Sequence, residues 1–128
     1  MLNLSLKEIS QALEKKKFTS VELTQFFLNR VKKHNPSLNA FITVDEGKSL
    51  AMAENADQLI QSGKKSILTG IPIAQKDIFC ADGWRTTCGS KMLDNFISPY
   101  DSTVIHKFNN AGAVNLGKTN MDEFAMGS

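Results

Sequence analysis

Hydrophobic residues recur at helical spacing early in the chain, and two helix starts there share one capping pattern. Ser5 is followed by Glu8, and Thr19 is followed at the same spacing by Glu22. A Ser or Thr with a Glu three residues later typically marks a helix N-terminus, because each side chain bonds the backbone N–H beside the other. We therefore predict helices that begin at these two caps. The apolar residues expected to face the core are Leu6, Ile9 and Leu13 in the first helix and Leu23, Phe26, Phe27 and Val31 in the second.

The second helix is expected to stop at Asn35-Pro36, because the residue before a proline is disfavoured in the α conformation. Residues 38–44 are rich in β-branched and aromatic side chains and predict a strand. Helical spacing returns from Glu46 to about Gln61. The first half of the chain therefore changes from helix to strand and back to helix.

The second half of the chain alternates strands with helices. The predicted elements are a strand at 71–75, an irregular Gly-rich segment at 83–90, a helix from Asp101-Ser102 to Gly112, a strand at 113–116 and a last helix capped by Asn120 with Glu123. Taken alone, this order predicts a parallel α/β sheet.

The segment Gly112 to Thr119 fits the written pattern of a phosphate-binding P-loop, G-x-x-x-x-G-K-[ST]. Such a loop must leave a strand and open a helix, so that its backbone N–H groups surround phosphate. Here a predicted helix precedes Gly112, and the residues after it resemble a buried strand. We interpret Gly112 as a glycine that ends a helix, followed by a strand.

Composition narrows the function classes. The 128 residues are 41% hydrophobic and 22% charged, with a net charge of +2, which gives no basic surplus of the kind that binds nucleic acid. No signal-like or membrane-length apolar run is present in the sequence, so we expect a cytoplasmic protein. Cys80 and Cys88 have no further ligands at zinc-site spacing. We expect them to be free, half-buried thiols, with no metal site.

Lys76 is the first candidate for chemistry, because it ends a strand-like apolar run. Burial at such a position can lower the pKa of a lysine until its amine acts as a base near neutral pH. Ser90 and Ser128 lie in segments where a site could form, but neither stands in the Gly-rich turn of a nucleophile. We interpret both as polar turn residues.

Three segments then carry a resemblance to a known family: GIPIAQKD at 70–77, TTCGS at 86–90 and LGKTNMDEFAMGS at 116–128. Together they resemble the amidase signature family, and within it the branch that serves tRNA-dependent amidotransferases. The resemblance implies an α/β fold, namely the N-terminal part of an α/β/α sandwich whose mixed, largely parallel sheet is preceded by two or three helices. We therefore expect residues 1–128 to be the N-terminal portion of a single amidase domain, incomplete at its C-terminus.

The resemblance also implies the site. The family uses a Ser–cis-Ser–Lys triad whose lysine matches Lys76, while Met126, Gly127 and Ser128 match residues near the substrate pocket. Lys118 matches a structural position. Family members carry both serines in a Gly/Ser-rich stretch downstream of the Met-Gly-Ser segment, and these 128 residues contain no such stretch. We therefore expect this piece alone to be inactive.

The whole protein is then expected to hydrolyse glutamine and supply ammonia to convert misacylated Glu-tRNA(Gln) to Gln-tRNA(Gln). The implied partners are the other subunits of a heterotrimeric amidotransferase. ATP, Mg²⁺ and most tRNA contacts would belong to a partner subunit, with no cofactor in this chain and no membrane. Two alternatives stay open: a stand-alone amidase acting on small amides, and a non-catalytic binding module.

Overall fold

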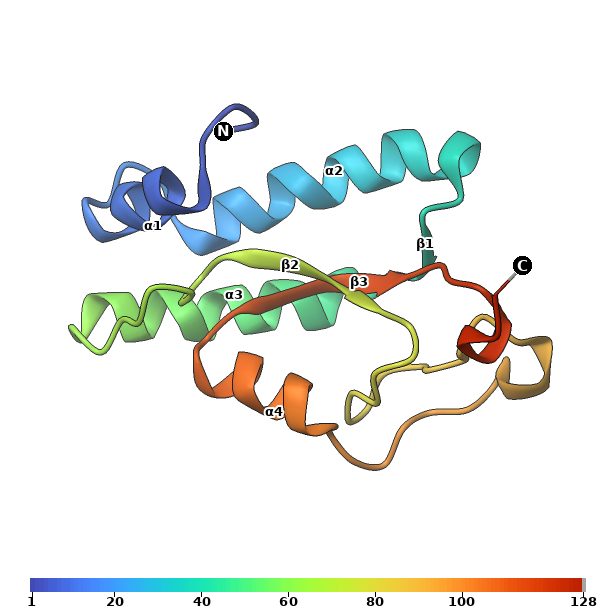
Figure 1. The fold of residues 1–128 in the computed structure, drawn as a ribbon. Coiled ribbons are helices and arrows are strands. Elements are labelled where there is room, and N and C mark those ends of the chain that lie inside the picture. Colours follow the sequence, from blue (N-terminus) through green and yellow to red (C-terminus); the bar gives the residue numbers. More distant parts are fainter. Residues whose placement is uncertain (128) are drawn as a thin grey trace.

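Four α-helices surround a small sheet of three strands in the computed structural model, which describes residues 1–127 (Figure 1). The elements are α1 (Leu6–Glu14), α2 (Ser20–Leu38), β1 (Phe41–Thr43), α3 (Glu46–Gln61), β2 (Pro72–Lys76), the 3₁₀ turn η1 (Lys91–Leu93), α4 (Thr103–Asn110), β3 (Val114–Thr119) and the 3₁₀ turn η2 (Glu123–Ala125). In Figure 1, α1 and α2 lie on one side of β2 and β3, and α4 lies on the other. Helix α3 packs against both α2 and β3.

The two predicted helix caps are confirmed. Ser5 Oγ accepts the Glu8 N–H at 3.3 Å, and the Glu8 carboxylate accepts the Ser5 N–H at 2.7 Å. Thr19 and Glu22 form the same reciprocal pair, at 3.0 and 2.9 Å. Each cap satisfies backbone donors that the first helical turn would otherwise leave without a partner. Local sequence therefore sets where both helices begin.

The predicted end of the second helix is wrong, because α2 continues through Pro36 to Leu38. The Asn35 side chain donates to the Phe41 carbonyl at 3.0 Å and accepts the Phe41 N–H at 2.8 Å. These two bonds hold the last turn of α2 against the start of β1 and offset the usual aversion of a pre-proline residue for the helix. Asn39 caps the C-terminus of the helix, and its left-handed φ of 52° turns the chain into the strand.

The sheet is mixed rather than purely parallel. β3 is central, pairing in parallel with β2 and antiparallel with β1. The parallel pairing predicted from the order of elements in the second half of the chain is confirmed for β2 and β3. The antiparallel strand β1 makes the sheet mixed, as the family resemblance implied. Gly117 permits this close pairing, because a Cβ there would lie 2.8 Å from both Phe41 Cδ1 and the Thr43 carbonyl oxygen.

Three groups of buried apolar side chains form the core. The first joins α1 and α2 to the residue just before β2, and its buried members are Ile9, Leu13, Leu23 and Ile71. The second joins α3 to β3 through Ala53, Ala56 and Val114. The third, beneath α4 and the loop before it, consists of Ala81, Trp84 and Ile105. Leu6, which the helical spacing places in the core, is 59% exposed, whereas Leu28 is buried and was not predicted. The outermost position of a short helix has no neighbouring element to cover it.

The structure also settles two elements near the C-terminal end. Gly112 follows α4 with a φ of 77°, and Ala113 N–H donates to the Phe108 carbonyl at 3.1 Å, so the interpretation of a helix-ending glycine before a strand is confirmed. The last helix is only the short turn η2, preceded by Asp122. Asn120 does not cap it, because Asn120 Oδ1 accepts the Met121 N–H at 2.9 Å, before the turn begins, while the Asn120 amide donates to the Asn39 carbonyl at 3.1 Å.

Candidate active site

Lys76 is the last residue of β2, in register with Thr119 of β3. Side chains alternate along a strand, so the buried Gln75 side chain and the Lys76 side chain point to opposite faces of the sheet. Lys76 is an exposed residue. The burial expected for its amine is therefore not found within residues 1–127, and its catalytic role stays a prediction.

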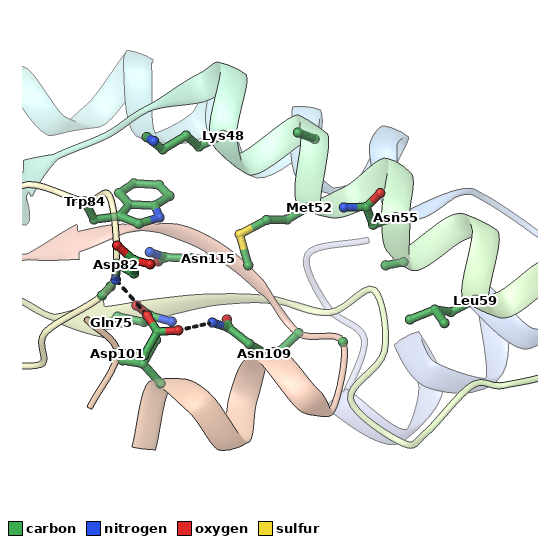
Figure 2. A pocket seen from close by; sticks show the side chains of 16 residues that line it. Lys48, Met52, Asn55, Leu59, Gln75, Asp82, Trp84, Asp101, Asn109 and Asn115 are labelled. Atoms are coloured by element: carbon green, nitrogen blue, oxygen red, sulfur yellow. Dashed lines mark hydrogen bonds between the residues drawn. The ribbon is translucent and has the colours of Figure 1, made fainter. Parts of the chain in front are cut away.

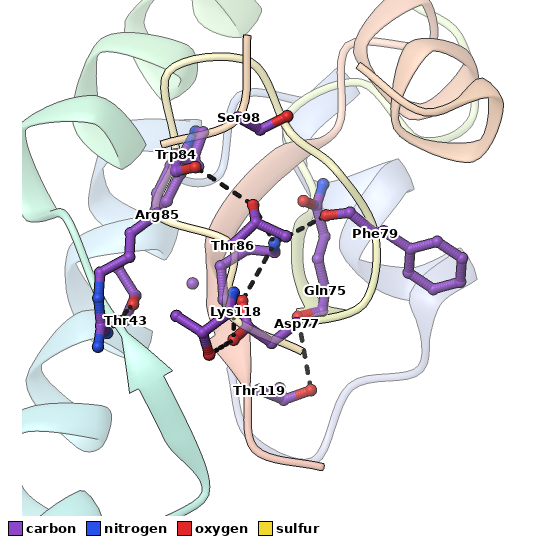
Figure 3. Close-up of polar contacts among 12 residues, drawn as sticks. Thr43, Gln75, Asp77, Phe79, Trp84, Arg85, Thr86, Ser98, Lys118 and Thr119 are labelled. Atoms are coloured by element: carbon purple, nitrogen blue, oxygen red, sulfur yellow. Dashed lines mark hydrogen bonds and ion pairs between the residues drawn. The ribbon is translucent and has the colours of Figure 1, made fainter. Parts of the chain in front are cut away.

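Asp77, the next residue, is completely buried and ties the end of β2 to the loop that follows it (Figure 3). Its Oδ2 accepts the Thr87 N–H at 3.0 Å and also accepts a hydrogen bond from the Thr87 hydroxyl. Its backbone N–H donates to the Thr119 carbonyl at 3.2 Å, and its carbonyl accepts the Cys88 N–H at 3.2 Å. Asp77 therefore joins β2, β3 and residues 86–90.

Lys118 supplies the opposite charge from β3. Its Nζ lies 3.3 Å from Asp77 Oδ1, and both side chains are fully buried. The ammonium also donates to the Phe79 carbonyl at 2.8 Å and to Thr86 Oγ1 at 3.1 Å. Among residues 1–127, Asp77 Oδ1 has no hydrogen-bond donor, so this ion pair is its main compensation for burial. Burial lowers the pKa of Lys118, and the Asp77 carboxylate opposes that shift.

The position of Lys118 agrees with the structural role that the family resemblance implied for it. A P-loop lysine must reach phosphate in an open loop, whereas this ammonium is enclosed by protein atoms. Burial also raises the pKa of the neighbouring Cys88 thiol, and the Asp77 charge adds to that effect. The residue that follows Lys76 therefore belongs to an ion pair, Asp77 with Lys118, that is fully enclosed by protein atoms.

Residues 86–90 pack against the C-terminal segment 120–127. The Phe124 N–H donates to the Cys88 carbonyl at 2.9 Å, and the Ser90 hydroxyl donates to Glu123 Oε1 at 2.7 Å. Cys88, Phe124 and Ala125 have φ values of 53°, 50° and 57°, which L-residues adopt at a cost. Two strained loops thus meet beside the end of β2. Such strain is common where a site needs a fixed backbone.

The predicted pocket residues lie in the second of these loops. Met126 is 84% exposed. Gly127, with a φ of 80°, donates its N–H to Asp122 Oδ2 at 2.6 Å. Ser128 lies outside the described residues. The substrate-pocket role of all three stays a prediction, and the structure brings the first two to the end of the sheet that carries Lys76.

Asp122 is expected to titrate below its ordinary pKa of 3.8, chiefly because its carboxylate accepts the Gly127 N–H and, less, because Lys76 lies near it. The folded turn therefore prefers the ionised carboxylate. Its contribution to the turn is fully present above the ordinary pKa and is lost as the pH falls through the lowered one. NMR titration of the carboxyl carbon should show this midpoint, and Lys76→Ala should move it upward. A midpoint at or above 3.8 would contradict the contact.

The other candidate groups have structural partners. Ser90 Oγ accepts the Met92 N–H at 3.2 Å while donating to Glu123, which fits the interpretation of a turn residue. Cys80 and Cys88 are free and half-buried, as predicted. Over residues 1–127, no three His, Cys, Asp or Glu side chains gather as a metal site would require, and no helix there is long and apolar enough to cross a membrane.

A cavity of about 510 Å³ lies between α3 and α4, on the face of the sheet away from Lys76 (Figure 2). Gln75 and Asn115 line it, and these two residues are 4% and 2% exposed. On its α4 side, the Asp101 carboxylate accepts the Asp82 N–H at 2.7 Å and the Asn109 amide at 3.2 Å. Lys76 does not line this cavity. The cavity and the predicted catalytic lysine are therefore separate features.

Sequence reasoning about the site missed Asp77 and its partners. Asp77 contacts residues 10 and 41 positions away, and such separations leave no periodic signal. An acid placed directly after a strand end, followed by the Thr86-Thr87 pair, was the only local hint. Spatial proximity, rather than spacing, reveals this pair.

Comparison with known proteins gives the family. The family described as Amidase matches residues 22–128. The chain is 66% identical to a glutamyl-tRNA(Gln) amidotransferase subunit of Nitrosomonas eutropha over 128 residues, which is all of this chain and 26% of that protein. It is 57% identical to the protein of the same name from Coxiella burnetii, over 97% of this chain and 26% of that protein.

The fold comparison agrees. The native peptide amidase of Stenotrophomonas maltophilia superposes with a TM-score of 0.89 at 29% identity, over 95% of this chain and 26% of that one. The chain thus spans about a quarter of the length of the relatives it matches. With the family match covering most of the 128 residues and the same fold found in a solved amidase, the chain belongs to the amidase family.

Proposed function

We propose that the whole protein is the glutamine-hydrolysing subunit of a tRNA-dependent amidotransferase. The observation that carries this proposal is the 66% identity to a relative named as a glutamyl-tRNA(Gln) amidotransferase subunit, which extends over every residue of this chain. Lys76 is exposed at the end of β2, so its amine is accessible to act as the base in this proposal.

In the proposed reaction, the amine of Lys76 accepts a proton from a bridging serine, which takes one from a nucleophilic serine. Both serines would come from the part of the protein beyond these residues. The nucleophile attacks the side-chain amide carbon of glutamine, the C–N bond breaks, and the leaving nitrogen takes up a proton as ammonia. Water then hydrolyses the acyl ester to give glutamate.

The proposed partners are the other subunits of a heterotrimer in the cytoplasm. A partner subunit would activate Glu-tRNA(Gln) with ATP and Mg²⁺ and combine it with the ammonia. The net charge of +2 on these 128 residues is small, which suits a division in which most tRNA contacts belong elsewhere.

A second candidate, an amidase that acts alone on small amides, is favoured by the fold shared with a peptide amidase at a TM-score of 0.89. The lysine chemistry would be the same in both cases, and only the source of the amide and the fate of the nitrogen would differ.

The deciding experiment uses the full-length protein with and without its co-purified partner subunits. We expect glutamine to release ammonia, and Glu-tRNA(Gln) with ATP and Mg²⁺ to accept that nitrogen only when the partners are present. Efficient hydrolysis of small amides, with no transfer to tRNA in the complete assembly, would favour the stand-alone amidase.

A further inference from the structure

Next to the predicted base lies a buried ion pair that the proposed chemistry does not use. We propose that Asp77 and Lys118 form a positioning pair for Lys76: they fix the backbone at the end of β2 and cancel each other's charge in the interior at that strand end. This inference rests on the proposed function, because Lys76 must act as a base for its position to affect turnover.

Hydrogen bonds on both sides of Asp77 fix the backbone at the end of β2. Asp77 directly follows Lys76, and both of its main-chain groups are bonded, to the Thr119 carbonyl and to the Cys88 N–H. Its carboxylate accepts two hydrogen bonds from Thr87, one from the backbone and one from the hydroxyl. The Cα of Lys76 is thus held by β3 on one side and by residues 86–90 on the other. A reacting group misplaced by about 1 Å can lose roughly 10²-fold in rate.

The charge part follows from burial. Asp77 and Lys118 are both 0% exposed, so water screens their charges weakly. The other titratable groups around the site are Cys80, Cys88, Asp122 and Glu123. Of these, Cys88 has its pKa raised by burial and by Asp77, and Asp122 has its pKa lowered in part by Lys76. While both members are ionised, their fields largely cancel at Lys76. Loss of either leaves one unbalanced buried charge, either on the residue that follows Lys76 or on the strand paired with β2.

The test is the pH dependence of kcat/KM for glutamine in the full-length protein with its partners, whose acid limb reports the pKa of the essential base. Lys118→Met leaves the Asp77 carboxylate, which favours the charged form of Lys76. That limb should move up by about half to one pH unit. Asp77→Asn leaves the Lys118 ammonium and should move the limb down by a similar amount. The double variant should return the limb near its original position.

Two matched variants separate positioning from general loss of stability. Asp57→Asn weakens a remote carboxylate that accepts the Ser20 and Val21 N–H groups at 2.7 and 3.1 Å; it should lower the melting temperature without moving the limb. Thr87→Val removes the hydroxyl bond to Asp77, together with the bond that the same hydroxyl accepts from the Gly89 N–H at 3.2 Å, and it keeps both charges. It should lower kcat about tenfold with KM and the acid limb unchanged, and it serves if a charge variant fails to fold.

Different results would overturn the role of Lys76 and the role of the ion pair. Full activity of Lys76→Ala would overturn the proposed role of that lysine. If Lys76→Ala is inactive, but the charge variants shift the limb in the same direction or not at all and Thr87→Val keeps its kcat, only the positioning pair is overturned. Opposite shifts that cancel in the double variant would support it.

Discussion

Replacing Lys76 with alanine should lower the kcat of glutamine hydrolysis by the full-length protein by about 10²-fold or more, because loss of a general base normally has an effect of that size. The fold should not change, since Lys76 is exposed and its strand is held by backbone pairing with β3 rather than by its side chain. Turnover is measured as ammonia released from saturating glutamine, with circular dichroism to check the fold.

The matched control for this experiment is Lys64→Ala. Lys64 is also exposed, but it lies in the turn between α3 and β2, away from the segments that gather around Asp77. Its removal should leave kcat unchanged. Retention of more than about a tenth of the original kcat by Lys76→Ala would rule out its role as the base.

Features of the fold that depend on neighbouring residues were predicted well. The caps at Ser5 and Thr19 are reciprocal contacts over three residues, and the third helix occupies Glu46–Gln61 as expected. The order of predicted elements, a helix before Gly112 and a strand after it, argued against a P-loop. The positive φ of 77° at Gly112 agrees with a glycine that ends a helix. In each case the deciding contact lies within one or two turns of the chain.

Features of the fold that depend on contacts between distant residues were not predicted from the sequence. The proline rule failed at Pro36, because Asn35 bonds the backbone of Phe41. Asn120 looked like a cap, but its amide bonds Asn39, 81 positions earlier. These bonds join elements that the local pattern cannot place side by side, so tertiary structure overrides propensity.

In the candidate site, too, the local motif was predicted and the burial of its residues was not. The motif at 70–77 identified Lys76 as the lysine to examine, but the sequence did not show that it is exposed here or that Asp77 beside it is buried. Burial depends on which segments cover a residue. Asp77 is covered by residues 86–90 and by β3, which lie later in the chain and approach it only through the fold.

The largest stability effect is expected from the pair itself. Lys118→Met should lower the free energy of unfolding by about 3–5 kcal/mol, because it leaves the fully buried Asp77 carboxylate without its counter-charge. The two hydrogen bonds from Thr87 keep part of the compensation. The measurement is denaturant unfolding of the full-length protein, followed as a shift of the midpoint at constant slope.

A double-mutant cycle tells whether this loss comes from the broken pair or merely from a poorer fit of the new side chain. Because the Asp77→Asn/Lys118→Met protein buries no net charge, it should be more stable than the protein with Lys118→Met alone. A double variant whose losses simply add would mean that Asp77 and Lys118 do not interact. Since Lys118 also bonds the Phe79 carbonyl and Thr86, the double variant should still fall short of the original stability. The coupling within the cycle then measures the part of the stability that belongs to the ion pair, separate from the part that Lys118 contributes by holding the loop after β2.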